Sequence, residues 1–399
     1  MRWVLPIMLI LGACGGDAAP LRSPQQRSAD SAPAVTALRG SQFALAERYA
    51  ASALALDPRN GQAAAVRAIT AYRTASTTLV QEIGMLFDKA EHFEFLDHTA
   101  GRAAWTTVLA QLDAVDRDLE IVAADREFSL DLCLACLEQD WNLNGRIDER
   151  DHELLELEYD GKGGRLADGD PRRRPTFRFD RGDAEWARAM IAFQRAAVNL
   201  VLAYKWSDLD KLFVHGLSGE RLEITLIDAG RVTRARELVL AGLDAADRCR
   251  DAYVAETDDE REWVPSPRQN DHPVPLAVDA TLYATWAGVI GDVRRMLRSE
   301  DGIGMREAAA LVDPALAALL PDAYVDLGAM LREPKDFVFD ATLARATKLE
   351  PFLRSLLGNG YRTKMRASSL VGRLRHVKDQ LDHGDETVGH KLRYLFWLN

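Results

Sequence analysis

The sequence predicts an all-α protein, built as an irregular array of many helices. Along much of the chain, apolar residues recur at spacings of three and four, which places them on one face of a helix. Alanine, leucine, arginine and glutamate dominate, whereas the alternation of β-branched residues that is typical of strands is almost absent. The helical pattern is clearest at residues 44–56, 105–121, 186–204 and 282–297.

Local signals predict where some elements begin. Asp180 and Asp183 precede a long amphipathic stretch and predict its N-terminal cap, and Ser218 predicts the start of another helix. Residues 337–339 predict a short extended piece. Because the break at 258–275 is rich in proline, it is the best candidate for a boundary between a helical region at 41–257 and a second one at 276–399.

Residues 1–13 predict a signal peptide. One arginine precedes a short apolar run that ends in small residues. The run is too short to span a bilayer, for which about 20 apolar residues are needed. Residues 14–40 are rich in glycine, alanine, serine and proline, so we expect them to form a disordered tether between a membrane and the folded body.

Leu11-Gly12-Ala13-Cys14 follows the apolar run directly and resembles the lipobox of bacterial lipoproteins. The resemblance implies that the Cys14 thiol receives a diacylglycerol, that the signal peptide is cut before it and that the new amino group is acylated. Gly15 at the next position favours the outer membrane, with the protein facing the periplasm. The alternative is an ordinary signal peptide with an incidental cysteine.

Composition and net charge limit the classes of molecule that we expect the protein to bind. The chain has 399 residues, of which 47% are hydrophobic and 28% charged, as in ordinary globular proteins. Its formal net charge of −11 argues against nucleic acid as a partner. We therefore expect two partners: the lipid bilayer, through acylated Cys14, and an unidentified protein of the envelope.

Residues 140–151 give the most specific indication of a chemical role in the sequence, the binding of a cation. Oxygen-bearing side chains stand at loop positions 1, 3, 5, 9 and 12, with glycine at position 6 and isoleucine at position 8. Ca²⁺ takes about six to eight oxygen ligands at roughly 2.3–2.6 Å, and a twelve-residue loop can supply them at these positions. The candidate ligands are Asp140, Asn142, Asn144, Arg146, Asp148 and Asp151.

This pattern resembles the EF-hand family, in particular its dockerin-like bacterial members, over about a dozen residues and their flanks. The resemblance implies a helix-loop-helix in which the three residues at loop positions 1, 3 and 5 each give one side-chain oxygen. It implies that Arg146 gives its backbone carbonyl, that Asp148 binds directly or through water, and that Asp151 closes the shell. Gly145 would allow the sharp turn. We expect helices over 128–138 and 149–159, with Ile147 packed between them.

The loop departs from the family in two ways. Asp151 stands where the family has a bidentate glutamate, and its shorter side chain would weaken Ca²⁺ relative to Mg²⁺. No second loop of this pattern occurs in the sequence, although such loops usually pair. Both departures favour a structural ion over a calcium switch. The alternative is a solvated polar turn, since Asp, Asn and Gly are common in turns.

Two further patterns concern cysteines and a helical hairpin. Cys133 and Cys136 predict either buried structural thiols or a local disulfide, because the sequence context of a redox pair or a zinc site is missing.

Residues 46–60 resemble the end of a tetratricopeptide repeat's second helix. The preceding helix would fall in the tether, and no period of about 34 residues follows. We therefore expect only the edge of a helical hairpin there.

The sequence contains no nucleophile elbow, no phosphate-binding glycine loop and no HExxH motif. The histidine pairs His92 with His98 and His383 with His390 are best interpreted as surface or capping residues. We therefore expect a membrane-anchored lipoprotein with a structural calcium site that acts as a binding or scaffolding module. The alternative is a periplasmic enzyme whose cleft is assembled from residues distant in sequence.

Overall fold

The computed structural model describes residues 30–91, 97–140, 145–153, 155–158, 164–207, 221–257, 261–269, 279–340 and 349–381. This part of the chain is mostly helical with a few short strands, in agreement with the predicted all-α class. Among its helices, none combines the length and the apolar character needed to cross a bilayer.

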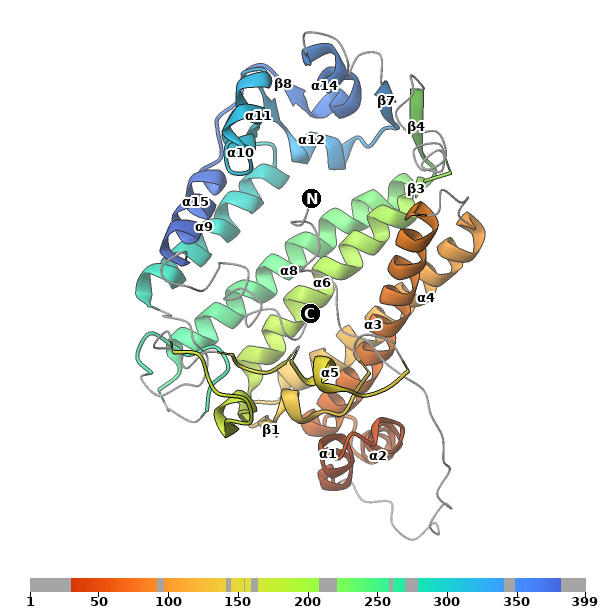
Figure 1. The fold of residues 1–399 in the computed structure, drawn as a ribbon, viewed down its shortest axis with the longest axis vertical. Coiled ribbons are helices and arrows are strands. Elements are labelled where there is room, and N and C mark those ends of the chain that lie inside the picture. Colours follow the sequence, from red (N-terminus) through yellow and green to blue (C-terminus); the bar gives the residue numbers. More distant parts are fainter. Residues whose placement is uncertain are drawn as a thin grey trace.

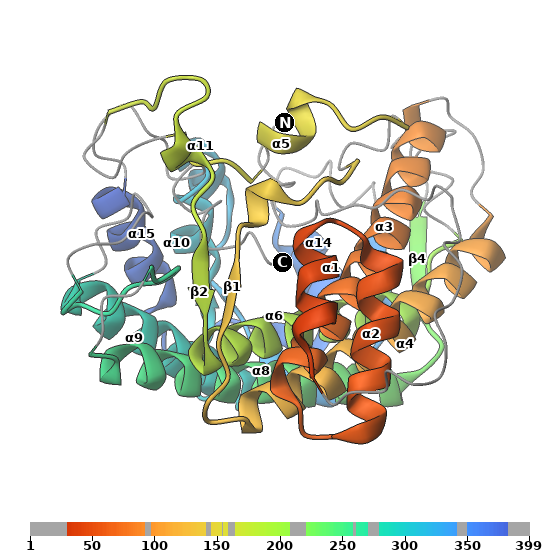
Figure 2. The same ribbon diagram turned by 90° about the horizontal axis from the view of Figure 1, so that it is seen from below.

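Four long helices form the centre of the molecule (Figure 1). They are α3 (Gly61–Glu91), α4 (His98–Ala124), α6 (Arg181–Ala203) and α8 (Ala229–Ala255). Each packs on the next in this order, and α9 (Ala280–Leu297) packs on α8. Figure 2 shows this layer from its edge, with the other elements rising from it. With α2 (Phe43–Leu56), these helices confirm the four stretches of helical periodicity.

The predicted cap of α6 is confirmed. The Asp180 side chain accepts hydrogen bonds from the backbone N–H groups of Gly182 and Asp183, and the Asp183 side chain accepts one from the Asp180 N–H at 2.8 Å. This reciprocal arrangement satisfies donors that the first turn of a helix leaves without partners. The cap also fixes the Asp183 side chain, which accepts a hydrogen bond from Tyr253 of α8.

The predicted tether is wrong at its C-terminal end, because residues 32–39 form a helix, α1 (Ala32–Arg39). Ala34 and Leu38 are fully buried in the main core, and α1 packs on α2. An apolar face at residues 34, 35, 37 and 38 outweighs the tether-like composition of the segment. The signal peptide, Cys14 and residues 15–29 lie outside the described residues.

In the part of the chain that the structure describes, three small antiparallel sheets join the helices. In one, β1 (Leu130–Leu132) pairs with β2 (Phe177–Phe179). In the second, β4 (Arg221–Leu226) lies between β3 (Tyr204–Lys205) and β7 (Phe337–Asp340), so the extended piece at 337–339 is confirmed. The third contains β5 (Ile303–Gly304), β6 (Tyr324–Val325) and β8 (Tyr361–Arg362).

The predicted helix after Ser218 is wrong, because residues 221–226 form β4. Strand pairing on both sides of this segment outweighs its capping signal. The remaining elements are short: η1 (Leu134–Cys136), α5 (Glu149–Glu153), η2 (Pro171–Arg173), α10 (Met305–Ala309), α11 (Pro314–Leu319), α12 (Leu327–Arg332), α14 (Glu350–Leu357), η3 (Gly358–Gly360) and α15 (Leu370–Leu381).

The segment predicted as an internal boundary contributes to the core. Trp263 is fully buried, with its ring centroid 6.1 Å from that of Phe179 and 6.5 Å from that of Trp186. Strands β4 and β7 also pair across the predicted boundary. The division into regions 41–257 and 276–399 stays a prediction.

Candidate cation loop and the apolar cavity beside it

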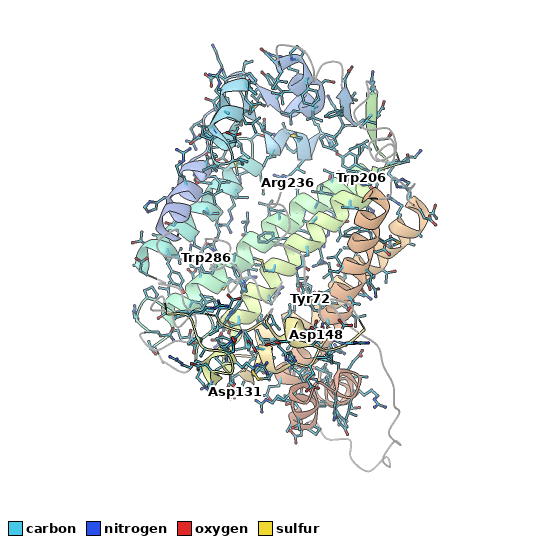
Figure 3. All side chains as sticks on the ribbon, in the orientation of Figure 1. Tyr72, Asp131, Asp148, Trp206, Arg236 and Trp286 are labelled. Atoms are coloured by element: carbon cyan, nitrogen blue, oxygen red, sulfur yellow. A yellow bond between two sulfur atoms is a disulfide. The ribbon has the colours of Figure 1, made fainter. Side chains whose placement is uncertain are left out.

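The two acidic residues at the ends of the predicted cation loop lie in the interior. Asp140 is 2% exposed and Asp151, in α5, is fully buried. Arg146 is exposed, and Asp148 is partly buried and lies near α5 (Figure 3). The other two predicted ligands, Asn142 and Asn144, lie outside the described residues. Burial of a carboxylate is costly unless its charge is compensated, and a bound cation would provide such compensation.

Both buried carboxylates hold the backbone of the loop. Asp140 Oδ2 accepts a hydrogen bond from the Gly145 N–H at 2.7 Å, and Asp151 Oδ2 accepts one from the Asp148 N–H at 2.9 Å. Gly145 has a φ of 82°, which side chains disfavour, although an added Cβ would meet no atom within 4 Å. Its backbone conformation, rather than lack of space, therefore requires glycine at this position.

The flanks of the loop differ from the prediction. The segment before it is not a helix over 128–138 but β1 followed by η1, because β1 pairs with β2 and residues 133 and 136 are joined by a disulfide. The predicted helix after the loop reaches only from Glu149 to Glu153 in the described residues. Without two long flanking helices there is no packing groove for Ile147, which is 50% exposed instead of buried.

Of the two alternatives for Cys133 and Cys136, the structure forms the local disulfide, with a Cα–Cα distance of 5.2 Å. The bond closes the turn of η1 shortly before Asp140. Cys249 is a free thiol that is fully buried, and burial raises its pKa well above the ordinary value. The three cysteines of the described residues therefore give one local crosslink and one buried core thiol.

The donor chemistry of residues 140–151 fits a hard cation, because every predicted ligand atom is oxygen. Within the described ranges, no three His, Cys, Asp or Glu side chains gather closely enough to hold a metal ion. The predicted donor set does not require such a group. Two of its members are amides outside those ranges, and a third is a backbone carbonyl.

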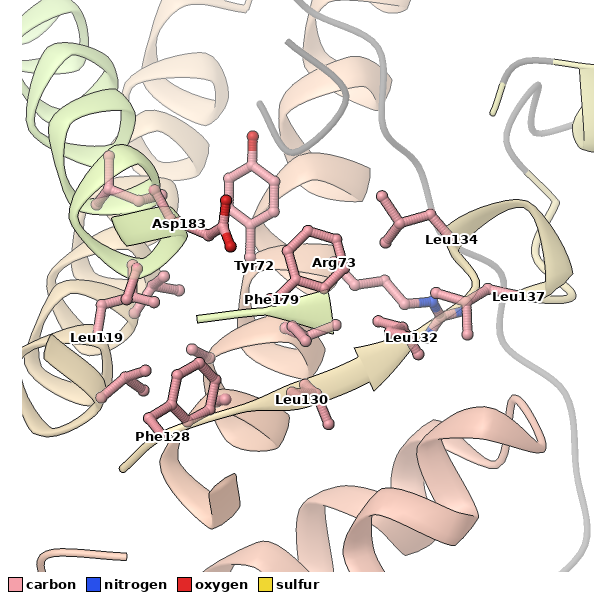
Figure 4. A pocket seen from close by; sticks show the side chains of 18 of the residues that line it. Tyr72, Arg73, Leu119, Phe128, Leu130, Leu132, Leu134, Leu137, Phe179 and Asp183 are labelled. Atoms are coloured by element: carbon pink, nitrogen blue, oxygen red, sulfur yellow. The ribbon is translucent and has the colours of Figure 1, made fainter. Parts of the chain in front are cut away.

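An apolar cavity of about 130 Å³ adjoins the segment that leads into the loop (Figure 4). Helices α3, α4 and α6 form one wall, and β1, η1 and β2 form the other. Most lining side chains are aliphatic or aromatic, among them Ile69, Leu119, Phe128, Leu132, Leu137 and Phe179. The sequence does not predict this cavity, because its wall comes from segments that are far apart in the chain and show only an ordinary apolar periodicity.

Asp183 lines the cavity from α6, and Tyr72 lines it from α3 (Figure 4). Its Oδ1 atom accepts a hydrogen bond from the Tyr253 hydroxyl at 2.6 Å. Burial, followed by the negative charge of Asp180, raises the pKa of the Asp183 carboxyl well above its ordinary value. The Tyr72 hydroxyl accepts a hydrogen bond from Gln194 Nε2 at 2.8 Å.

On the opposite side of the cavity, Arg73 and Gln139 are joined. Arg73 Nε donates to Gln139 Oε1 at 3.0 Å, and the Arg73 guanidinium lies 4.0 Å from the centroid of the Phe43 ring. Gln139 directly precedes Asp140, so the wall of the cavity and the first residue of the loop are neighbours in the chain. His98 begins α4, whereas His92, His383 and His390 lie outside the described residues.

Asp183→Asn should change how stability depends on pH. A raised pKa means that the folded protein keeps this proton above pH 4, where an unfolded aspartate, with a pKa of about 3.9, has released it. The carboxyl therefore lowers stability as pH rises from that value towards the folded pKa, and an amide removes this dependence.

Denaturant unfolding at pH 5 and pH 8 measures the effect. Wild type should lose stability relative to Asp183→Asn as the pH is raised. Asp168→Asn serves as the control, because the Asp168 side chain is 91% exposed. Equal pH dependence in wild type and Asp183→Asn would contradict the assignment.

Comparisons with known proteins give no assignment: no family model, no curated protein and no solved structure matches the chain. The similarity to EF-hand loops therefore rests on residues 140–151 themselves, and the similarity to a tetratricopeptide repeat rests on residues 46–60. Both similarities stay predictions.

Proposed function

We propose that this protein is a membrane-anchored lipoprotein of the bacterial envelope that acts as a binding module, with Ca²⁺ as a structural ion in the loop at 140–151. One observation carries the proposal. The oxygen-bearing residues stand in the register of a calcium loop, and the carboxylates at its two ends are buried and hydrogen-bonded to loop N–H groups. A solvated turn would not require this burial.

The ion would act as a clamp between two elements. Asp140 follows η1 and the cavity wall, and Asp151 belongs to α5, so a cation bound by both would hold these elements together. Because such a site does not exist in the unfolded chain, the binding free energy would add to the stability of the fold. Extracellular EF-type modules bind Ca²⁺ at roughly 10⁻⁴–10⁻³ M, which suits a compartment rich in the ion. Mg²⁺ is the alternative ion, because Asp151 is short.

Two features favour the envelope. The lipobox-like sequence that ends in Cys14 predicts acylation, which would anchor the chain in the bilayer and, with Gly15 next, in the outer membrane. The disulfide between Cys133 and Cys136 is a bond that persists in oxidising compartments such as the periplasm. We also propose that the protein binds another protein of the envelope.

The cavity favours binding as the activity. Its wall is almost entirely apolar, which suits the burial of an apolar group more than proton transfer to a substrate. Its two carboxyl groups belong to the cap of α6: Asp180 accepts from N–H groups of the first turn, and Asp183 accepts from Tyr253 and the Asp180 N–H. No specific observation in the described residues favours the enzyme alternative.

Asp140→Ala should abolish Ca²⁺ binding. The substitution removes the first ligand and also the acceptor of the Gly145 N–H hydrogen bond. Calorimetric titration with Ca²⁺ should give a binding isotherm for wild type and none for the variant. Glu149→Gln is a matched control, because Glu149 is an exposed acidic residue of the same segment that is not a predicted ligand. Equal heats for wild type and Asp140→Ala would refute the site.

Cys14→Ser should release the protein from the membrane. Without the thiol there is no acceptor for the diacylglycerol, and the anchoring contribution of about 0.8 kcal/mol per buried CH₂ is lost. Fractionation of cells that express the two forms should find wild type in washed membranes and the variant outside them. Retention of Cys14→Ser in those membranes would show that another feature holds the protein there.

A further inference from the structure

A second pocket, of about 430 Å³, is lined by residues of α9 and α10 and by the start of α15, which Figure 1 shows along one edge of the molecule. Its lining side chains in the described residues are all polar or charged: Thr285, Glu307, Ser369, Arg373 and His376, with Gly372 among them. A polar ligand loses hydrogen bonds to water on binding and needs partners in their place. This lining can provide such partners.

Arg373 supplies the positive charge of the pocket. Its Nε atom donates to Asp292 Oδ2 at 2.9 Å, and its guanidinium lies against α9 at Gly288, where an added Cβ would come within 2.5 Å of Cζ. These contacts hold the guanidinium in place. In the described part of the chain its terminal nitrogens, Nη1 and Nη2, have no hydrogen-bond partner, so they are available to a ligand.

Glu307 supplies a negative charge to the same pocket. It is partly buried, and within the described ranges its carboxylate forms no ion pair and accepts no hydrogen bond. Arg373 and Glu307 therefore line one pocket without pairing with each other. Each can form a charge-assisted hydrogen bond with an opposite charge on a ligand.

Thr285 places a hydroxyl in the wall that the protein itself does not use. The residue is 8% exposed and lines the pocket. The hydroxyls of Thr106 and Thr107 donate to backbone carbonyls of the preceding helical turn, whereas that of Thr285 makes no hydrogen bond among the described residues. It is not one of the polar atoms there that are closed off from solvent, so its accessible surface lies at the pocket. A ligand in the pocket can supply the missing partner.

The start of α15 adds donors for an anionic group. The N–H groups in the first turn of a helix lack intrahelical partners, and the helix dipole favours negative charge there. The Leu370 N–H donates to Ser368 Oγ at 3.3 Å, whereas Gly372 lines the pocket, and a Cβ added to it would meet no atom within 4 Å. Because Arg373 belongs to the same turn, the cation and the helix terminus can act on one carboxylate.

We propose that this pocket binds a free amino acid in its zwitterionic form. Arg373, the start of α15 and the Thr285 hydroxyl would donate to its carboxylate, and Glu307 would accept from its ammonium group. A simple anion would leave the Glu307 charge without a partner, and a simple cation would leave that of Arg373. This inference goes beyond the proposed function, since it requires neither the cation site nor the membrane anchor.

Glycine, β-alanine and γ-aminobutyrate test the proposal, because they separate the two charged groups by increasing lengths. Each is compared with the carboxylate that lacks its amino group and with the amine that lacks its carboxylate. Dissociation constants are measured by ligand-detected NMR on the full protein. At least one amino acid should bind about tenfold or more tightly than both of its analogues, the factor expected for a hydrogen bond to a charged group. If no amino acid binds, or a carboxylate or amine alone binds equally well, the proposal is wrong.

Glu307→Gln removes the negative charge and keeps the size of the side chain. The amino acid should then bind about tenfold or more weakly, whereas its matched carboxylate should bind at least as tightly as before. Glu333→Gln is the control, because Glu333 is exposed and does not line the pocket. Unchanged amino-acid binding in Glu307→Gln would overturn the proposal.

Thr285→Val keeps the shape of the side chain and removes the hydroxyl. Because this hydroxyl has no partner among the described residues, the melting temperature should not fall, but the amino acid should bind about two- to tenfold more weakly. A lower melting temperature with unchanged affinity would assign the hydroxyl to the fold and contradict its role in the pocket. If Glu307→Gln does not fold, the amino-acid series and Thr285→Val still decide.

Discussion

Asp140 and Asp151 stand at the two ends of a short loop, and both are buried. We infer that the arrangement of this end of the molecule depends on keeping these two carboxylates in the interior. Each carboxylate holds one backbone N–H of the loop, at Gly145 and at Asp148. A cation between them would offset the cost of burying two negative charges. The loop would then hold η1, which forms part of one wall of the apolar cavity.

On the proposed function, neighbouring residues would serve both structure and binding. Gln139 lines the cavity, and the next residue in the chain, Asp140, begins the loop. The pairing of β1 with β2 keeps the first part of this wall extended, and the disulfide between Cys133 and Cys136 closes the turn of η1. Leucine side chains of both elements line the cavity. The long helices supply the rigid side of the cavity, and the loop segment supplies the side that a cation could stabilise.

Much of the helical array could be predicted, because α2, α4, α6 and α9 carry clear apolar periodicity and α6 carries a complete capping box. The short elements could not. Residues 32–39 look like a tether in composition but bury Leu38, and the segment before Asp140 has apolar residues that fit a helix equally well. There, tertiary pairing with β2 and a crosslink decide the conformation. The loop register is readable as a motif, whereas the cavity depends on packing between distant segments.

Amide hydrogen exchange of residues 128–139, compared between Ca²⁺-saturated and chelated protein, tests the central claim most directly. The account predicts slower exchange in this segment when Ca²⁺ is bound, because the clamp suppresses local opening of β1 and η1. Exchange in α14, which lies at the opposite end of the molecule from α5 (Figure 1), should stay the same. Equal exchange of residues 128–139 with and without Ca²⁺ would contradict the account.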